Sequence, residues 1–199
     1  PRPPPPPTRA PPPLAPPEER REISLLDGLI RREQVNVAFF APSLLGMFAN
    51  LDFPFMKTLL FGAEAISEML FNRLKQQPYR LMTVYGPPEN TVLSTKQIVN
   101  DETSYDNIGY PLEGTTCHIL SEDLQQVVGG ATGELYLSGP QVSPGYIGNK
   151  ELNEKSFIFY HGERLYRTGD LVRQQPDGSI RFIGRKDTQV KMRGFRIEL

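Results

Sequence analysis

The chain has 199 residues, a formal net charge of -1 and 20 prolines, 11 of which lie within residues 1–17. That stretch cannot bury an apolar face, but the overall content of 38% hydrophobic and 10% aromatic residues can supply a core, so a wholly disordered protein is excluded. The balanced charge gives no footprint for nucleic acid, and no apolar run reaches the roughly 18 residues of a membrane helix or forms a signal peptide. We therefore expect a cytoplasmic protein without nucleic-acid or membrane partners, and the single cysteine, Cys117, agrees with a reducing compartment.

The proline-rich leader, residues 1–21, favours polyproline II and is expected to be disordered. One interpretation makes it a ligand for an SH3-type or WW-type groove. The alternative is a linker without a binding role, and the composition favours this second interpretation.

Residues 22–100 alternate between helical and strand-like patterns, which predicts an α/β unit. Ser67 stands where the cap of a helix is expected, with Phe71 and Leu74 on the buried side of that helix. The expected elements are, in chain order, a helix at residues 25–30, a strand at 35–39, a helix at 42–48, a strand at 56–61, a helix after residue 67 and a strand at 80–84. Strands joined by helical crossovers form a parallel sheet, and its ligands bind at the carboxyl ends of the strands, where Gly62 and Tyr85 fall.

Beyond about residue 100 the chain changes to short strands separated by glycines, which predicts a small antiparallel, β-barrel-like subdomain over residues 101–183. The strands are expected at residues 115–120, 134–138, 171–175 and 179–183. The sequence Pro-Asp-Gly at residues 176–178 predicts a hairpin between the last two. Residues 184–199 are expected to form a hinge and the start of a further C-terminal subdomain, truncated within an element.

Two histidines and one cysteine restrict the possible metal and nucleophile sites. Cys117 and His118 are neighbours in a predicted strand, so their side chains project to opposite faces and cannot form a thiol–imidazole pair. We expect Cys117 to pack in the core and His161 to lie in a surface turn. A histidine-based metal site is excluded.

Four short blocks rich in Gly, Asp, Glu and Arg carry the functional signal. They are YGPPENT at residues 85–91, GELYLSGPQVSPGY at 133–146, YRTGDL at 166–171 and GRKDTQVKMRGFRIEL at 184–199. Each block alone is compatible with an ordinary turn in a solvated face. In the third block, Asp170 follows a glycine turn, where its carboxylate can accept both hydroxyls of a vicinal diol such as ribose. Each such hydrogen bond is worth about 1.5–3 kcal/mol.

In this order the four blocks closely resemble the consecutive core motifs of the adenylation domains of nonribosomal peptide synthetases, in the adenylate-forming superfamily that also contains acyl-CoA ligases and luciferase. The resemblance covers about residues 35–199, and QVKMRGFRIEL favours the amino-acid-activating synthetases of secondary metabolism. It implies part of the adenylate-forming N-terminal core. It also implies that a carboxylate attacks the α-phosphorus of Mg-ATP to give an acyl-adenylate and pyrophosphate. The acyl group would then pass to the phosphopantetheine thiol of a peptidyl carrier domain.

The resemblance assigns roles to residues of this chain. Asp170 and Arg185 would bind the ribose, Tyr85 and Phe182 would flank the nucleotide, and Glu89 would coordinate Mg2+. The full set expected to hold ATP or AMP is Gly62, Ala63, Glu64, Tyr85, Gly86, Asp170, Phe182 and Arg185. The residues expected to line part of the acyl pocket are Leu60, Gly62, Val84, Val92 and Leu93. This apolar lining points to a hydrophobic amino or aryl acid as substrate.

The chain also departs from the family pattern. Pro88 stands in place of a threonine that faces the phosphate, Thr83 in place of an asparagine, and Pro144 in place of an arginine. The chain contains neither the lysine-bearing Ser/Thr/Gly-rich phosphate loop, nor the aspartate for the substrate amino group, nor the catalytic lysine of the C-terminal subdomain. No complete catalytic set is therefore expected, and the chain by itself is expected to be inactive. Two alternatives stay open: a non-catalytic remnant or adaptor that uses the proline-rich tail, and a fragment of an acyl-CoA ligase.

Overall fold

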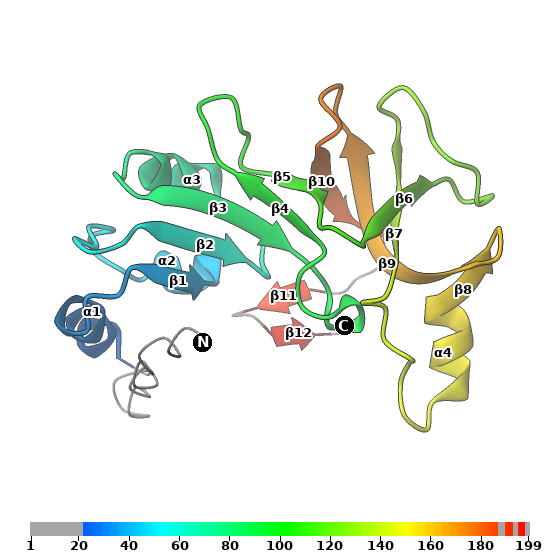
Figure 1. Ribbon diagram of the computed structural model, residues 1–199, viewed down its shortest axis with the longest axis horizontal. Coiled ribbons are helices and arrows are strands. Elements are labelled where there is room, and N and C mark those ends of the chain that lie inside the picture. Colours follow the sequence, from blue (N-terminus) through cyan, green and yellow to red (C-terminus); the bar gives the residue numbers. More distant parts are fainter. Residues whose placement is uncertain (1–21, 187–189, 193–194, 198–199) are drawn as a thin grey trace, which may run out of the picture.

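The computed structural model describes residues 22–186, 190–192 and 195–197 (Figure 1). The predicted leader, residues 1–21, lies outside the described residues, as do several positions of the predicted hinge segment. The helices are α1 (Ile23–Arg32), α2 (Pro42–Leu45), α3 (Glu68–Lys75), α4 (Lys150–Ser156) and the short 3-10 helix η1 (Pro88–Asn90). The strands are β1 (Val37–Phe40), β2 (Thr58–Gly62), β3 (Arg80–Tyr85), β4 (Thr95–Ile98), β5 (Asn107–Pro111), β6 (Thr116–Leu120), β7 (Thr132–Ser138), β8 (Phe157–Tyr160), β9 (Glu163–Gln174), β10 (Ile180–Arg185), β11 (Val190–Met192) and β12 (Phe195–Ile197).

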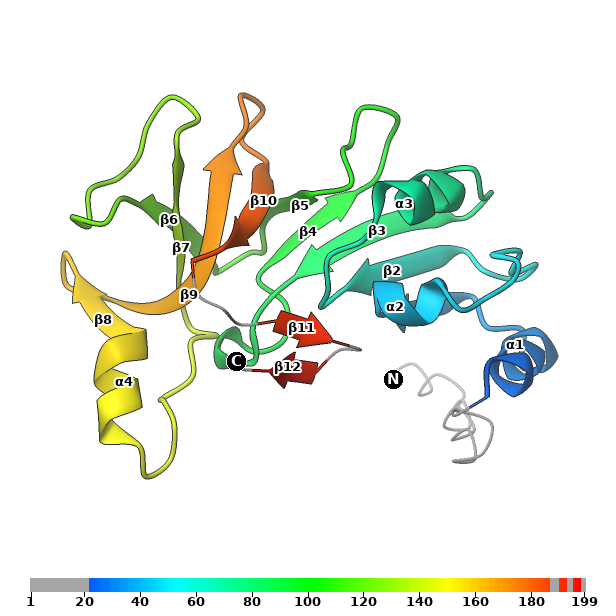
Figure 2. The same cartoon turned by 180° about the vertical axis from the view of Figure 1, so that it is seen from behind.

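The first half of the chain forms the α/β unit that the sequence predicts. Strands β1, β2 and β3 pair in parallel, and helices α2 and α3 lie on the face of the sheet that is turned toward the viewer in Figure 2. Ser67 caps α3 as expected, because its hydroxyl accepts a hydrogen bond from the Leu70 backbone at 3.3 Å. Phe71 and Leu74 are buried under this helix and pack with Phe61 of β2 in one core. The period of 3.6 residues in the sequence thus identifies the buried side of α3 correctly.

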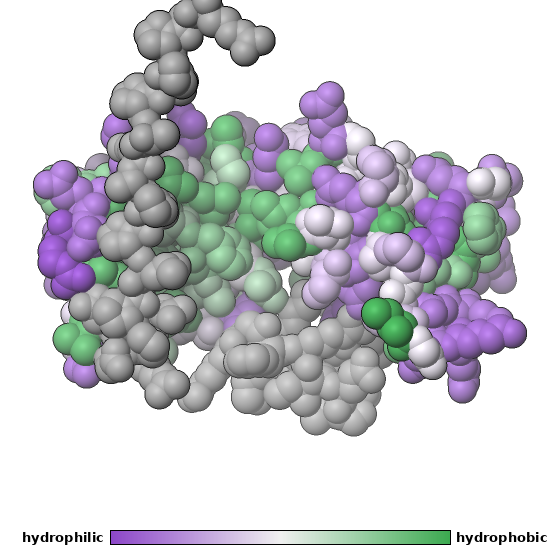
Figure 3. All heavy atoms as spheres, turned by 60° about the horizontal axis from the view of Figure 1, so that its bottom comes forward, coloured by the Kyte–Doolittle hydropathy of each residue, from purple (hydrophilic) through white to green (hydrophobic). Residues whose placement is uncertain are grey.

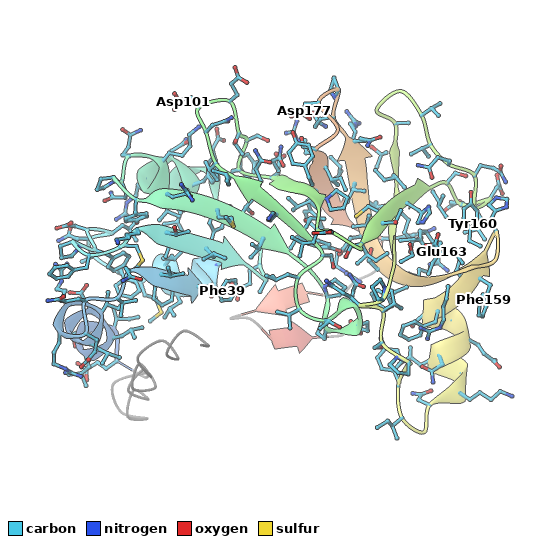
Figure 4. All side chains as sticks on the ribbon, viewed as in Figure 1. Phe39, Asp101, Phe159, Tyr160, Glu163 and Asp177 are labelled. Carbon is cyan, nitrogen blue, oxygen red and sulfur yellow. The ribbon has the colours of Figure 1, made fainter. Side chains whose placement is uncertain are left out.

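The opposite face of this parallel sheet has a different character. Phe39, Leu60, Met82 and Ile98 lie side by side on β1 to β4, and Phe39 and Ile98 are 50% and 53% exposed. In the part of the chain that the structure describes, no helix covers this row. Phe39 stands on this face in Figure 4, and Figure 3 shows apolar side chains gathered over the half of the molecule that contains β1 to β4.

The second half is antiparallel, as predicted, but it does not close into a barrel. Strand β5 pairs with both β4 and β10, so a 10-stranded sheet runs in the order β1-β2-β3-β4-β5-β10-β9-β7-β6, with β8 attached to β9. The prediction of a barrel-like subdomain is therefore corrected to an open sheet, because β5 joins the antiparallel strands to the parallel ones. The change of direction also comes earlier than expected, since β4 already pairs antiparallel with β3.

The hairpin predicted around residues 176–178 is confirmed. Strands β9 and β10 pair antiparallel, and the Gln175 backbone donates to the Ser179 carbonyl at 2.8 Å. Asp177 lies at the tip of this hairpin (Figure 4) and accepts from the Ser179 hydroxyl at 2.7 Å. A second hairpin, β8–β9, turns through the exposed residue His161, in agreement with the predicted surface turn.

Cys117 packs against the second core, which includes Ile119, Leu135 and Val172, as predicted. Burial raises the pKa of the Cys117 thiol to about 12. His118 points away from it, toward Ser138 Oγ at 3.3 Å and Glu163 Oε2 at 3.2 Å. None of the described helices has the length and apolar character needed to cross a membrane.

Candidate functional site

A cavity of about 370 Å³ opens where the parallel and antiparallel strands meet. It lies at the carboxyl ends of β2 and β3, the place that the sequence predicts for a ligand. Strands β9 and β10 close the other side with Asp170 and Arg185. The lining residues are Phe61, Gly62, Ala63, Glu64, Ala65, Ile66, Thr83, Val84, Tyr85, Gly86, Tyr105, Asp106, Asn107, Ile108, Asp170, Phe182, Gly184 and Arg185.

Asp170 is the central charged group of this cavity and is only 3% exposed. One carboxylate oxygen accepts a hydrogen bond from the Tyr85 hydroxyl at 2.5 Å, and the other accepts from the Arg185 guanidinium at 2.6 Å. Its own backbone N–H donates to the Thr168 hydroxyl at 3.0 Å. The carboxylate is therefore held in one orientation by groups from three strands, β3, β9 and β10.

Tyr85 ends strand β3 and is buried beside Asp170. Burial is the main cause that raises the pKa of Tyr85 well above its usual value, and the negative charge of Asp170 raises it further. The Tyr85 phenol therefore stays protonated at neutral pH and donates its hydrogen bond to the Asp170 carboxylate. The family resemblance implies that the Tyr85 ring flanks the nucleotide, and the structure shows in addition that its hydroxyl holds the Asp170 carboxylate.

An irregularity in β10 brings Phe182 and Arg185 to the same cavity. In a regular strand, residues three positions apart project to opposite faces. Here the pairing with β9 shifts between Phe182 and Gly184, so Phe182 lies opposite Val172 and Arg185 lies opposite Asp170. Such bulges redirect side chains, which explains how both residues line the cavity.

The Gly62-Ala63-Glu64 segment forms the floor of the cavity at the end of β2. A Cβ atom at Gly62 would lie 2.0 Å from the Val84 carbonyl oxygen, so glycine is required here for the close approach of β2 and β3. Ala63 adopts a φ of 70°, in the left-handed region that costs strain for a residue other than glycine. Glu64 accepts a hydrogen bond from the Ser43 backbone at 3.1 Å through one oxygen.

Glu89, the residue expected to bind Mg2+, lies in η1 and is 7% exposed. It is outside the lining of the cavity, but η1 follows directly on Tyr85 and Gly86, which belong to it. Within the residues described by the structure, no group of three or more His, Cys, Asp or Glu could hold a metal ion. A single carboxylate such as that of Glu89 still suits Mg2+, because this ion is commonly bound through one or two carboxylates together with substrate phosphates.

The structure divides the residues of the expected acyl pocket. Gly62 and Val84 line the cavity, whereas Leu60, Val92 and Leu93 lie outside it. Leu60 belongs to the apolar row, on the same face of β2 as Gly62 but two residues further from the end of the strand, and Val92 is 69% exposed in a left-handed conformation with a φ of 73°. The acyl-pocket role of these three residues stays a prediction.

Residues 105–108 line the cavity but were missed by the sequence analysis. Asp106 holds Arg181 at 2.6 Å, and its backbone carbonyl accepts from the Phe182 N–H at 2.9 Å. Only the pairing of β5 with β10 brings this segment to the site. The only local hint in the sequence was the glycine within Asn-Ile-Gly-Tyr-Pro, because a glycine inside a strand often marks a close approach of another backbone. In the structure Gly109 has a φ of 84°, and a Cβ there would lie 2.0 Å from the Lys96 carbonyl oxygen.

The chain is similar to known proteins over this same region. A family model described as "AMP-binding enzyme" matches residues 13–147. The match begins within the proline-rich segment, earlier than the resemblance read from the motifs. Bacitracin synthase 1 of Bacillus licheniformis is 37% identical over 182 residues, covering 90% of this chain and 3% of that protein. Surfactin synthase subunit 3 of Bacillus subtilis is 42% identical over 185 residues, covering 87% of this chain and 14% of that protein.

Solved structures give the same picture. The structure of PA1221, an NRPS protein containing adenylation and PCP domains, matches with a TM-score of 0.80 and 32% identity, covering 89% of this chain and 38% of that one. Its holo form, bound to a vinylsulfonamide inhibitor, matches with a TM-score of 0.80 and 31% identity, covering 89% and 33%. The chain therefore spans about a third of these structures and a small part of the synthetases.

Proposed function

The chain belongs to the AMP-binding enzyme family, and from this premise we propose that its cavity is the adenosine-binding part of an adenylation site for an amino or aryl acid. In the proposed reaction the acid and Mg-ATP give an acyl-adenylate and pyrophosphate. The acyl group then passes to a phosphopantetheine thiol on a carrier domain. The similarity to NRPS structures with adenylation and PCP domains supports this pairing.

The observation that carries the proposal is the buried carboxylate of Asp170. A carboxylate offers about four lone-pair sites. Tyr85 and Arg185 use two of them, so two can accept the 2′- and 3′-hydroxyls of a ribose. Because both protein donors fix the carboxylate before the ligand arrives, binding needs little reorganisation.

The other groups act by position and charge. Because Gly62 has no side chain, a flat base could lie against its backbone, and the Phe182 ring would contact the nucleotide from β10. Glu89 would hold Mg2+, which when bound would neutralise charge on the ATP phosphates. The apolar side chains Val84, Val92 and Leu93 would favour a hydrophobic acid.

The ribose assignment is tested from the ligand side. We expect the 199-residue chain to bind AMP at least about tenfold more tightly than 2′,3′-dideoxy-AMP in calorimetric titrations. Two charge-assisted hydrogen bonds are worth on the order of 3–6 kcal/mol before water compensates for their loss. Half of the lower value, about 1.5 kcal/mol, already corresponds to a roughly tenfold difference in affinity. The change is made in the ligand, so it leaves the fold intact. Equal affinities would rule out the ribose role of Asp170.

A further inference from the structure

A loop that the proposed function leaves unused packs against the turn that carries Glu89. The loop follows β7, and its Ser143 backbone N–H donates to the Glu89 carbonyl at 2.8 Å. In return, the hydroxyl of Thr91, which follows η1, donates to the Gln141 backbone carbonyl of this loop at 2.7 Å. Two hydrogen bonds thus join η1 and its C-cap residue Thr91 to a segment about 50 residues further along the chain.

The same loop places a tyrosine on the Glu89 side chain. The Tyr146 hydroxyl donates to Glu89 Oε1 at 2.5 Å, a charge-assisted hydrogen bond across 57 positions of sequence. Glu89 is 7% exposed, so this contact lies away from most of the solvent and is stronger than the same pair would be in water.

Tyr146 is itself held rigidly. Asn153 of α4 accepts from the Tyr146 backbone N–H at 2.6 Å and donates to its carbonyl at 2.8 Å. The ring packs against Phe157 with 5.7 Å between ring centroids. Gly145 has a φ of 131°, and a Cβ there would lie 2.5 Å from Asn153 Oδ1, so glycine is required before the tyrosine. The Pro-Gly-Tyr sequence, which alone looks like an ordinary turn, therefore aims one hydroxyl group at one carboxylate.

We propose that Tyr146 is a positioning residue that orients the Glu89 carboxylate for the metal ion of the nucleotide. The proposal rests on the proposed function, in which Glu89 holds Mg2+. A metal ion binds more tightly to a carboxylate whose torsion is fixed beforehand, because the side chain loses less freedom on binding. Hydrogen-bond partners of metal ligands commonly change metal affinity by about 10–100-fold.

The test uses the 199-residue chain, ATP and Mn2+ as a substitute for Mg2+. ATP affinity is measured by calorimetry in excess Mn2+ and again in EDTA, and the ratio of the two affinities reports the metal contribution. We expect Tyr146→Phe to lower this ratio about tenfold and to leave the EDTA affinity close to that of the wild type, while the lost hydrogen bond to Glu89 lowers the melting temperature. A tyrosine that only supports the fold would shift both ATP affinities together.

Two further variants complete the design. Tyr110→Phe is the matched control, since its hydroxyl also donates to a carboxylate, that of Asp177 at 3.1 Å, on an exposed hairpin. The ratio of ATP affinities in Mn2+ and in EDTA should be the same for Tyr110→Phe as for the wild type. Glu89→Gln should abolish the effect of Mn2+. If Glu89→Gln abolishes it and Tyr146→Phe does not lower it, the positioning role is overturned and the metal assignment stands. If Glu89→Gln keeps the wild-type ratio, both are overturned.

Discussion

Replacing Asp170 by alanine should cost both stability and nucleotide affinity. The carboxylate is 4% exposed in its side chain and receives hydrogen bonds from Arg185, whose side chain is 13% exposed, and from Tyr85. Removing one partner of a buried ion pair typically costs about 3–5 kcal/mol. Tyr85→Phe removes only one of the two hydrogen bonds, so about 1.5–3 kcal/mol is expected. Among single substitutions of the site, Asp170→Ala should also weaken AMP binding most.

Urea denaturation gives the stability directly. The chain has no tryptophan, so the transition is followed by far-ultraviolet circular dichroism. A typical domain unfolds with about 5–15 kcal/mol, so a loss of about 3–5 kcal/mol leaves the alanine variant folded and measurable unless the wild type lies at the low end of that range. Asp170→Asn, which keeps the volume, serves as a milder variant for AMP titration. If Asp170→Ala unfolds within about 0.5 kcal/mol of wild type, the Tyr85–Asp170–Arg185 contacts do not hold the site together, and the reasoning fails.

Three further predictions follow from other parts of the chain. Burial raises the pKa of the Cys117 thiol from 9.0 to about 12. Because the thiolate is the nucleophile, this thiol should react with a disulfide reagent at pH 8 on the order of a thousandfold more slowly in the folded chain than in urea. Similar rates in the two states would contradict its burial. The raised pKa also means that its contribution to stability is present below pH 9 and is lost as the pH rises toward 12. Phe39 is 50% exposed, so Phe39→Ser should reduce binding of the dye ANS to the exposed apolar row and change the free energy of unfolding by less than about 1 kcal/mol. Unchanged dye binding would show that the dye binds elsewhere. The 199-residue chain should give no amino-acid-dependent ATP–pyrophosphate exchange, because it has no lysine-bearing phosphate loop, and exchange that survives repurification would refute this.

Local patterns determined much of the secondary structure. The cap at Ser67, the buried positions of α3 and the hairpin at residues 176–178 all depend on residues a few positions apart, so the sequence alone identifies them. Motif order identified the family in the same way. It also pointed to Asp170 and Arg185, which the structure brings into direct contact.

Tertiary structure decided how these pieces combine. The sequence predicts strands but not their partners, so the open sheet through β5 and the entry of residues 105–108 into the cavity were not foreseen. The shift in the pairing of β10, which turns both Phe182 and Arg185 to the site, depends on the register with β9. Tyr146 reaches Glu89 across 57 positions for the same reason. Contacts of this kind arise only when distant segments meet, because a side chain's local sequence fixes its backbone preference but not the group it will face.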